Sequence, residues 1–266
     1  GSPFSRSEAA TPRPASRRRP RLAGRHPPLG LHGDHDGAGR ACGLAGPNAI
    51  AVQDNFAVWM GSRGFYMYDG YIKSVPCEVS DYVFSDINQA QISKSYAVNN
   101  SQFDEVWFFY PSAASQENNR YVIWNYVQNN WSIGNLGRSA GIDRGVFANP
   151  LMVADDGYIY DHEIGMNHGT ESVYAETGPV QIGQGDNILY INEMIPDERN
   201  QGEVTATFSS RYYPNGTEQT FGPYSLTNPT SVRFNGRQIQ MKVTAVNNSD
   251  WRIGTQRLNA IPGGRR

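Results

Sequence analysis

A repeated aromatic hairpin is the sequence feature that most constrains the fold of this chain. The stretch from Phe56 to Gly70 consists of two short aromatic strands joined by a Gly-flanked turn. The stretch from Leu151 to Asp161 repeats the pattern closely, and the stretch from Glu105 to Asn125 repeats it with a longer polar loop. Hairpins that recur with an aromatic second strand predict blade-like units such as those of a β-propeller.

The composition agrees with an all-β protein. The 266 residues include 28 Gly, 15 Tyr and 11 Phe, and only 18% are charged, which favours a turn-rich aromatic β fold over amphipathic helices. We expect partial β-propeller-like blades over 48–177, followed by an antiparallel unit over 178–266. In that second unit, Glu203–Phe208 and Gln238–Val246 alternate apolar and polar residues, as strands with one wet face do. Periodicity leaves open whether it is a β-sandwich or the closing blades of a propeller.

Finer expectations concern single elements. Asn215-Gly216 and Asn235-Gly236 predict two tight hairpin turns. A strand from Ile188 to Ile195 would place Tyr190, Asn192 and Met194 on one side. Residues 85–91 could form one helical turn capped by Ser85.

The N-terminal segment, residues 1–47, has a different character. It lacks hydrophobic periodicity, and its densest cluster is Arg17-Arg18-Arg19-Pro20-Arg21. Such a segment cannot bury enough apolar surface to offset its ordering entropy, so we predict disorder. It is either a basic arm for nucleic acid or targeting, or sequence that is not native to this fold. The abrupt change of composition near Asn48 favours the second interpretation.

The charge is divided unevenly along the chain. Residues 1–50 hold eight Arg against three acids, a net charge of +5, so the remainder carries −7 within a total of −2. An acidic folded part argues against a broad nucleic-acid-binding face.

The densest set of candidate metal ligands follows the third hairpin. Asp155, Asp156, Asp161 and His162 could together hold Ca²⁺ or a transition metal. Alternatively, Asp155-Asp156-Gly157 is a simple turn, and the residues from Asp161 are solvated ones that follow a strand. Because no EF-hand or zinc-helix spacing is present, we predict no metal and no cofactor. No nucleophile elbow, Cys–His arrangement or phosphate loop is present either, so we predict that the protein is not an enzyme.

The aromatic residues admit two interpretations. They could stack on sugar rings, or they could fill the cores of the blades, and we favour the cores because each large ring buries much area. This interpretation predicts that Trp59 and Tyr66 are buried. The full set is Trp59, Tyr66, Tyr68, Trp107, Trp124, Trp131, Tyr158, Tyr160 and Trp251.

The C-terminal stretch carries the most distinctive motifs. They are Phe234-Asn235-Gly236-Arg237-Gln238, Asp250-Trp251-Arg252-Ile253-Gly254, and an end that runs from Arg257-Leu258-Asn259 to Pro262-Gly263-Gly264-Arg265-Arg266. With the blade strands Gly64–Gly70 and Asp156–Asp161, they resemble propeller-type tail proteins of short-tailed bacteriophages. That family comprises tail nozzle or hub proteins and packaged-DNA stabilisation proteins. The resemblance covers about 48–266 and departs at the N-terminus, where family members continue with further blades.

The resemblance implies a structural virion protein, made in the host cytoplasm and located in the tail. Its partners would be further copies in a ring, other tail or portal proteins, and viral DNA that passes without sequence recognition; no membrane anchor is expected. Arg252, Arg257, Arg265 and Arg266 could dock on an acidic neighbouring subunit, or they could be solvated. A carbohydrate-binding or glycan-hydrolysing β-propeller is the alternative function.

Overall fold

The computed structural model describes residues 12–13, 42–169, 171–181, 187–196, 203–226, 229–248 and 250–264. These residues confirm the predicted all-β class, since antiparallel sheets make up both of the compact units into which the chain divides. We call the described residues up to Ile164 the N-terminal unit and those from Gly165 the C-terminal unit. Most of the predicted N-terminal segment lies outside the described residues.

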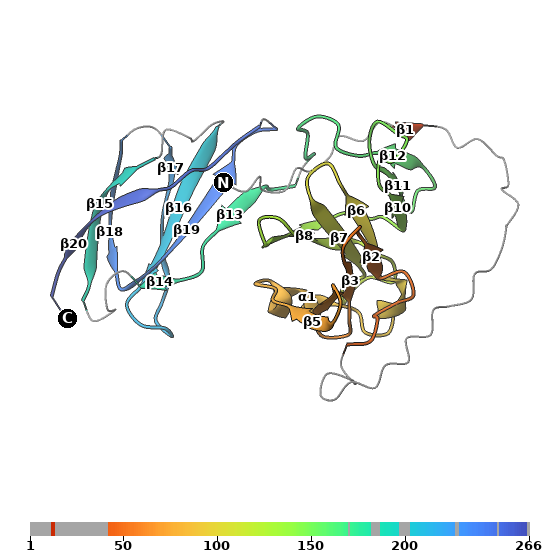
Figure 1. Cartoon of the computed structure of the whole chain (residues 1–266). Helices are drawn as coiled ribbons and strands as arrows, with labels where there is room; N and C mark the ends of the chain where they lie inside the picture. The colour runs from red at the N-terminus through yellow and green to blue at the C-terminus, as the bar shows by residue number, and fades with distance from the viewer. Residues whose placement is uncertain are drawn as a thin grey trace, which may run out of the picture. The chain divides into compact units, whose positions relative to one another are not determined.

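The described residues of the N-terminal unit form three antiparallel sheets (Figure 1). Apart from one two-residue strand near the N-terminus, strands that follow one another in the chain are neighbours in each sheet. The first sheet holds β2 (Ile50–Val52), β3 (Ala57–Met60), β4 (Phe65–Tyr68) and β5 (Ile72–Val75). The second holds β6 (Tyr96–Asn100), β7 (Glu105–Tyr110), β8 (Arg120–Asn125) and β9 (Asn130–Asn135). The third holds β10 (Ala140–Ile142), β11 (Leu151–Val153) and β12 (Ile159–Asp161), with β1 (Pro12–Arg13) paired to β12. The three hairpins predicted from the aromatic repeat are all present, as β3–β4, β7–β8 and β11–β12.

The first strands of successive sheets lie side by side. The amide of Ala97 in β6 donates to the carbonyl of Asn48 at 2.8 Å, just before β2, and this bridge is parallel. The side chain of Asn99 adds a second bond to the carbonyl of Val52, also at 2.8 Å. On the other side of β6, Gly141 of β10 packs closely against Val98. The strands β2, β6 and β10, each of which begins a run of consecutive paired strands, therefore lie next to one another in that order.

Aromatic and aliphatic side chains of the first two sheets form one core. Phe65 packs against Phe108 and Trp131, with ring centres 5.1 and 4.6 Å apart. Val58, Val106 and Val122 are completely buried beside them. The aromatic strands are thus the packing surfaces of the sheets, which is why their pattern was visible in the sequence.

A short helix, α1 (Ser80–Asp86), and a 3₁₀ turn, η1 (Ile92–Lys94), connect the first two sheets. The predicted helical turn capped by Ser85 is wrong, because the helix begins earlier and has no side-chain cap. The hydroxyl of Ser85 instead donates to the carbonyl of Tyr82 within the helix. This is the local bond with which serine competes for backbone groups inside helices.

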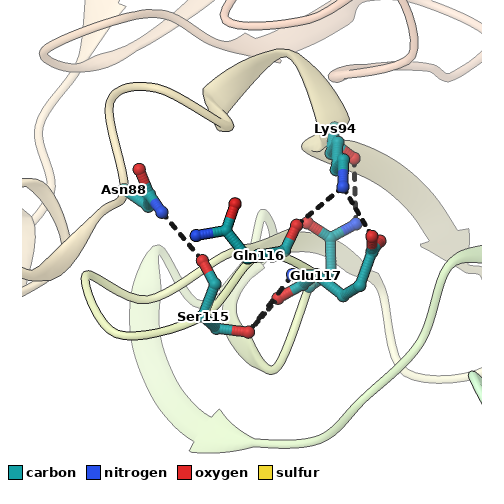
Figure 2. Close-up of polar contacts among 6 residues, drawn as sticks. Asn88, Lys94, Ser115, Gln116 and Glu117 are labelled. Atoms are coloured by element: carbon teal, nitrogen blue, oxygen red, sulfur yellow. Dashed lines mark hydrogen bonds and ion pairs between the residues drawn. The ribbon is translucent and has the colours of Figure 1, made fainter.

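Polar contacts fasten the β7–β8 loop to this connection (Figure 2). The side chain of Asn88 donates to the carbonyl of Ser115 at 2.8 Å, and Nζ of Lys94 donates to the carbonyl of Gln116 at 2.7 Å. Lys94 also pairs with Glu117 at 2.5 Å. The buried amide of Asn118 donates back to the carbonyl of Lys94 at 2.9 Å. The loop is therefore held through its backbone carbonyls as well as through one ion pair.

The C-terminal unit is a β-sandwich, which decides between the two architectures that periodicity left open. One sheet has the order β13 (Tyr174–Glu176), β19 (Gln238–Ala245), β16 (Val204–Arg211), β17 (Gln219–Ser225), and β14 (Val180–Gln181) also pairs with β19. The other has the order β18 (Thr230–Gly236), β15 (Leu189–Ile195), β20 (Arg257–Pro262). Figure 1 labels the strands of both sheets. Phe208 of the first sheet stacks on Phe234 of the second, with ring centres 4.8 Å apart, inside one shared core.

The alternation predicted for this unit is confirmed in β16, where Val204, Ala206 and Phe208 are buried. In β15 the prediction is wrong for Met194, which is fully buried while Tyr190 faces outward. The register of β15 shifts between Ile191 and Glu193 against both neighbouring strands. A bulge of this kind reverses which side chains face the core, and period-2 counting cannot foresee it.

The two Asn-Gly pairs have different outcomes. Asn215-Gly216 lies in the connection of the β16–β17 hairpin, so this hairpin is present, although its connection, residues 212–218, is longer than a tight turn. Asn235-Gly236 does not form a hairpin, because β18 and β19 belong to different sheets and the chain crosses between them here. A Cβ on Gly236 would lie 2.8 Å from the Cβ of Ser210, so glycine allows the crossing chain to approach β16.

The boundary between the units lies after Ile164, earlier than the expected boundary after residue 177. The reason is the pairing of β13, which lies within the stretch 48–177 that we expect to form propeller-like blades. Tyr174 pairs with Thr244 and Glu176 with Lys242, so β13 is an edge strand of the sandwich.

Candidate functional site

The predicted ligand cluster begins with the turn Asp155-Asp156-Gly157. Gly157 has a φ of +83°, which the turn requires, and the carboxylate of Asp156 accepts bonds from the Tyr158 amide and from the Tyr160 hydroxyl at 2.9 and 2.5 Å. Donation by Tyr160 and by the Tyr158 amide lowers the pKa of Asp156, and the same bond raises the pKa of Tyr160. The carboxylate of Asp156 is thus occupied in stabilising the hairpin.

Asp161 and His162 are buried, with 8% and 1% of their surface exposed. The alternative that they are solvated residues after the strand is therefore wrong. Pairing continues beyond β12, since the amide of His162 donates to the carbonyl of Pro150 at 2.8 Å and holds this segment in the sheet. Sequence alone could not show that the sheet extends past Asp161.

A buried arginine organises this region. Nε of Arg138, a residue only 8% exposed, donates to Nε2 of His162 at 3.0 Å. Its guanidinium carbon lies 4.7 Å from the ring centre of Tyr160, whose hydroxyl in turn bonds Asp156. Burial lowers the pKa of His162 to about 4, so the imidazole is neutral near pH 7 and can accept the bond from Arg138. The network ties β12 and its turn to the segment before β10.

The four candidate ligands do not converge on a common centre. Asp156 is directed to Tyr160, and His162 to Arg138. Among the residues that the structure describes, no three His, Cys, Asp or Glu side chains form a group able to hold a metal ion.

A carboxylate pair that the sequence did not reveal lies nearby in the same unit. The buried amide of Asn100 donates to Oε2 of Glu105 at 3.3 Å and to Oε1 of Glu163 at 3.1 Å. Glu105 also accepts a bond from the Trp107 indole at 3.0 Å, and Glu163 has a φ of +62°. Glu105 and Glu163 are 58 positions apart in the chain, so only the neighbouring second and third sheets bring them together. The shared amide offsets the repulsion between the two carboxylates.

The tryptophans of the N-terminal sheets are core residues, and the tyrosines of the same set are more exposed. Trp59, Trp107, Trp124 and Trp131 are all buried, which confirms the packing interpretation for them. Tyr66 is half-buried and stacks on Trp59 with ring centres 6.1 Å apart. The interpretation is wrong for Tyr68 and Tyr158, which are 47% and 46% exposed at the ends of their hairpins. The four tryptophans are therefore not available to stack on a sugar.

Exposed aromatic rings instead line a hollow of about 420 Å³ in the C-terminal unit. The lining residues come from the start of β15, the loop after β16 and the crossing between β18 and β19. They are Ile188, Tyr190, Tyr212, Tyr213, Asn235 and Arg237. This volume lies within the roughly 300–1,000 Å³ of small-molecule sites in proteins. None of these residues was a candidate from sequence; the signal available was the tyrosine pair directly before Pro214-Asn215-Gly216.

Two of the four arginines predicted to contact a neighbouring subunit are among the residues that the structure describes. Arg252 and Arg257 are both exposed in the C-terminal unit, whereas Arg265 and Arg266 lie outside the described residues. Their role in contacting a neighbouring subunit stays a prediction.

In the parts of the chain that the structure describes, no helix has the length and apolar character needed to span a bilayer. Comparison with protein-family models and with curated proteins finds no match to this chain.

Proposed function

We propose that this protein is a structural tail component of a short-tailed bacteriophage or prophage. It would assemble as an oligomeric ring at the head–tail channel, with copies of itself and with tail or portal proteins as partners. The motifs at 234–238, 250–254 and 257–266 support the family, as do the expected blade strands at 64–70 and 156–161. In this proposal the protein acts through assembly rather than catalysis, in the virion.

The arrangement of the three N-terminal sheets supports a propeller-type architecture. Apart from β1, each is a meander, and the strands β2, β6 and β10 that begin the three meanders are neighbours in that order. Propellers place the first strands of their blades around a central channel and typically contain four to eight blades. Three such sheets therefore fit a blade assembly that is completed by further sheets.

The observation that carries the proposal is the apolar surface of the β10–β11 loop. Val146 is 95% exposed and Phe147 48%. Ile142, the last residue of β10 before this loop, is 56% exposed. An apolar group of this kind, left uncovered in one chain, is characteristic of protein interfaces.

The loop that carries Val146 and Phe147 is anchored at its beginning. The carboxylate of Asp143 accepts bonds from the Ser101 amide at 3.3 Å and from the Arg144 amide at 2.7 Å. The amide of Phe147 donates back to the carbonyl of Arg144. Little ordering is therefore needed for this loop to bind a partner, which favours its use as a contact.

The test measures self-association of the full chain by light scattering and by electron microscopy. We expect concentration-dependent oligomers and ring-shaped particles. A double substitution, Val146→Asp with Phe147→Asp, should weaken association about 100-fold, since burying two such side chains contributes about 3 kcal/mol or more.

Val127→Asp is the matched control, because Val127 is 67% exposed in the β8–β9 turn of the same unit. It should leave the oligomers intact. A chain that stays monomeric at all concentrations and yields no rings would contradict the proposal. So would an encoding gene without portal, terminase or capsid genes beside it.

A further inference from the structure

We infer that two copies of this chain join through their N-terminal units into one closed propeller of six sheets. Each copy supplies three sheets, and the third sheet of one copy packs on the first sheet of the other. Because the two copies must associate, the inference rests on the self-association in the proposed function. It adds the partner, a second copy, and the two sheet faces that meet.

The three sheets are stacked face to face in chain order. Phe108 and Phe109 follow one another in β7 and therefore point to opposite faces of the second sheet. Phe108 shares a core with Val58 of the first sheet, whereas Phe109 shares a core with Met152 of the third. This arrangement leaves one face of the first sheet and one face of the third sheet outside the two cores. We call these the outer faces.

The outer face of the first sheet is apolar. A row of directly paired residues crosses all four strands and consists of Val52, Ala57, Tyr68 and Ile72. The row lies on the outer face, because Ala57 is next to Val58, which points into the core. In this row Val52 is 65% exposed and Ile72 46%. Trp59, on the same face, is already buried, and its indole donates to the carbonyl of Cys42 at 2.7 Å.

The outer face of the third sheet is apolar as well. Because Met152 points into the core with the second sheet, its neighbours Leu151 and Val153 point outward. Val153 pairs with Ile159, which is 40% exposed. The outward positions of β10 and β11 carry no charged residue, and neither do those of β2–β5. Depletion of charge is characteristic of the centre of a protein interface.

A second copy is the partner that continues the stacking in the same direction. Within the chain, each sheet packs one face on the sheet before it and the other face on the sheet after it. The third sheet of one copy can receive the first sheet of another copy in this way, and the third sheet of that copy can receive the first sheet of the original. Such head-to-tail contacts form closed rings when the rotation permits. Six sheets lie within the four to eight blades typical of propellers, whereas three do not.

The experiment measures the mass of the full chain by analytical ultracentrifugation and native mass spectrometry. We expect a dimer as the smallest assembled species. Val52→Asp on the first outer face and Ile159→Lys on the third-sheet outer face should each weaken the dimer at least tenfold, because each would bury a charge in an apolar contact. Val127→Asp, in the β8–β9 turn of the second sheet, introduces the same charge as Val52→Asp at a position of similar exposure, and should dimerise as the unaltered protein does.

Mixing the two variants tests the head-to-tail arrangement. In a mixed dimer, one of the two contacts joins two unaltered faces, and the other brings the aspartate face to the lysine face. An equimolar mixture should therefore dimerise at least tenfold more tightly than either variant alone. This recovery also shows that both variants are folded.

A monomeric unaltered protein, dimers unchanged by either substitution, an equal loss in Val127→Asp, or no recovery on mixing would each overturn the inference. Rings that persist in both Val52→Asp and Ile159→Lys would overturn it while leaving the proposed function intact. Dimers that need both outer faces but never form rings would support the inference and contradict the proposed function.

Discussion

At the scale of single residues, the tertiary structure gives structural roles to side chains that the sequence presented as candidate metal ligands. His162 was a candidate metal ligand by residue type, yet it is fully buried and accepts a bond from Arg138. Asp156 was another, yet it stabilises its own hairpin. Neither assignment could be made from the sequence, because Arg138 and His162 are 24 positions apart and become neighbours only across the third sheet.

The buried imidazole makes stability depend on pH. Burial lowers the pKa of His162 from 6.5 to about 4. Between these two pH values, the unfolded chain therefore binds a proton at His162 that the folded protein does not bind. The free energy of unfolding should therefore fall by about 3 kcal/mol as the pH drops from 6.5 to 4, because each pKa unit is worth about 1.4 kcal/mol. Above pH 6.5 the contribution is fully present.

Urea unfolding at several pH values checks this expectation. In His162→Gln, whose side chain stays neutral, the fall over this window should be smaller than in the unaltered protein. Unfolding curves whose pH dependence is the same for both proteins would show that His162 does not take part.

At the scale of elements, strands with regular alternation were predictable and the irregular positions were not. β16 follows its pattern through Val204, Ala206 and Phe208, whereas the bulge in β15 carries Met194 to the opposite face. The contacts that hold the β7–β8 loop could not be predicted from the sequence either, because their acceptors are the backbone carbonyls of Ser115, Gln116 and Lys94. Backbone acceptors have no signature in a sequence.

The β7–β8 loop allows the contribution of a buried hydrogen bond to stability to be compared with that of an exposed ion pair. Asn118 is only 7% exposed, and Asn118→Ala removes its hydrogen bond to the carbonyl of Lys94. This substitution should lower the free energy of unfolding by about 1–2 kcal/mol. Glu117→Ala removes an ion pair whose carboxylate side chain is 63% exposed, and should cost at most about 0.5 kcal/mol. Chemical unfolding of the two variants measures the difference, and a larger loss in Glu117→Ala would contradict this ranking.

At the scale of the whole molecule, charge separates the Arg-rich N-terminal segment from the rest. Residues 1–50 carry +5 and the remainder −7. A channel protein that lets DNA slide should not hold it tightly through its folded surface, and an acidic balance is compatible with that role.

DNA binding by the full chain should therefore depend on the N-terminal arginines. Replacing Arg17, Arg18, Arg19 and Arg21 together by Ala should weaken the binding of the chain to duplex DNA. It should also reduce the log–log slope of the salt dependence by about 0.9 for each phosphate that the arginines no longer neutralise. Fluorescence anisotropy at several salt concentrations measures both quantities.

The control for this experiment is the double variant Arg252→Ala with Arg257→Ala, which removes two exposed cations from the C-terminal unit. It should bind DNA as the unaltered protein does. If this control loses binding while the N-terminal variant retains it, the folded part contains the DNA-binding surface and the assignment by charge is wrong.

The sequence by itself determined the β class, the three aromatic hairpins and the burial of the four tryptophans of the N-terminal sheets. These properties are local, because alternation, turn residues and aromatic content act over a few positions. The tertiary structure decided that β13 belongs to the sandwich, that β18 and β19 lie in different sheets, and that Met194 is buried. It also decided which polar groups meet: Glu105 with Glu163 through Asn100, and Tyr212 with Asn235. Such contacts depend on which strands pair across long stretches of chain, and no spacing within one strand encodes them.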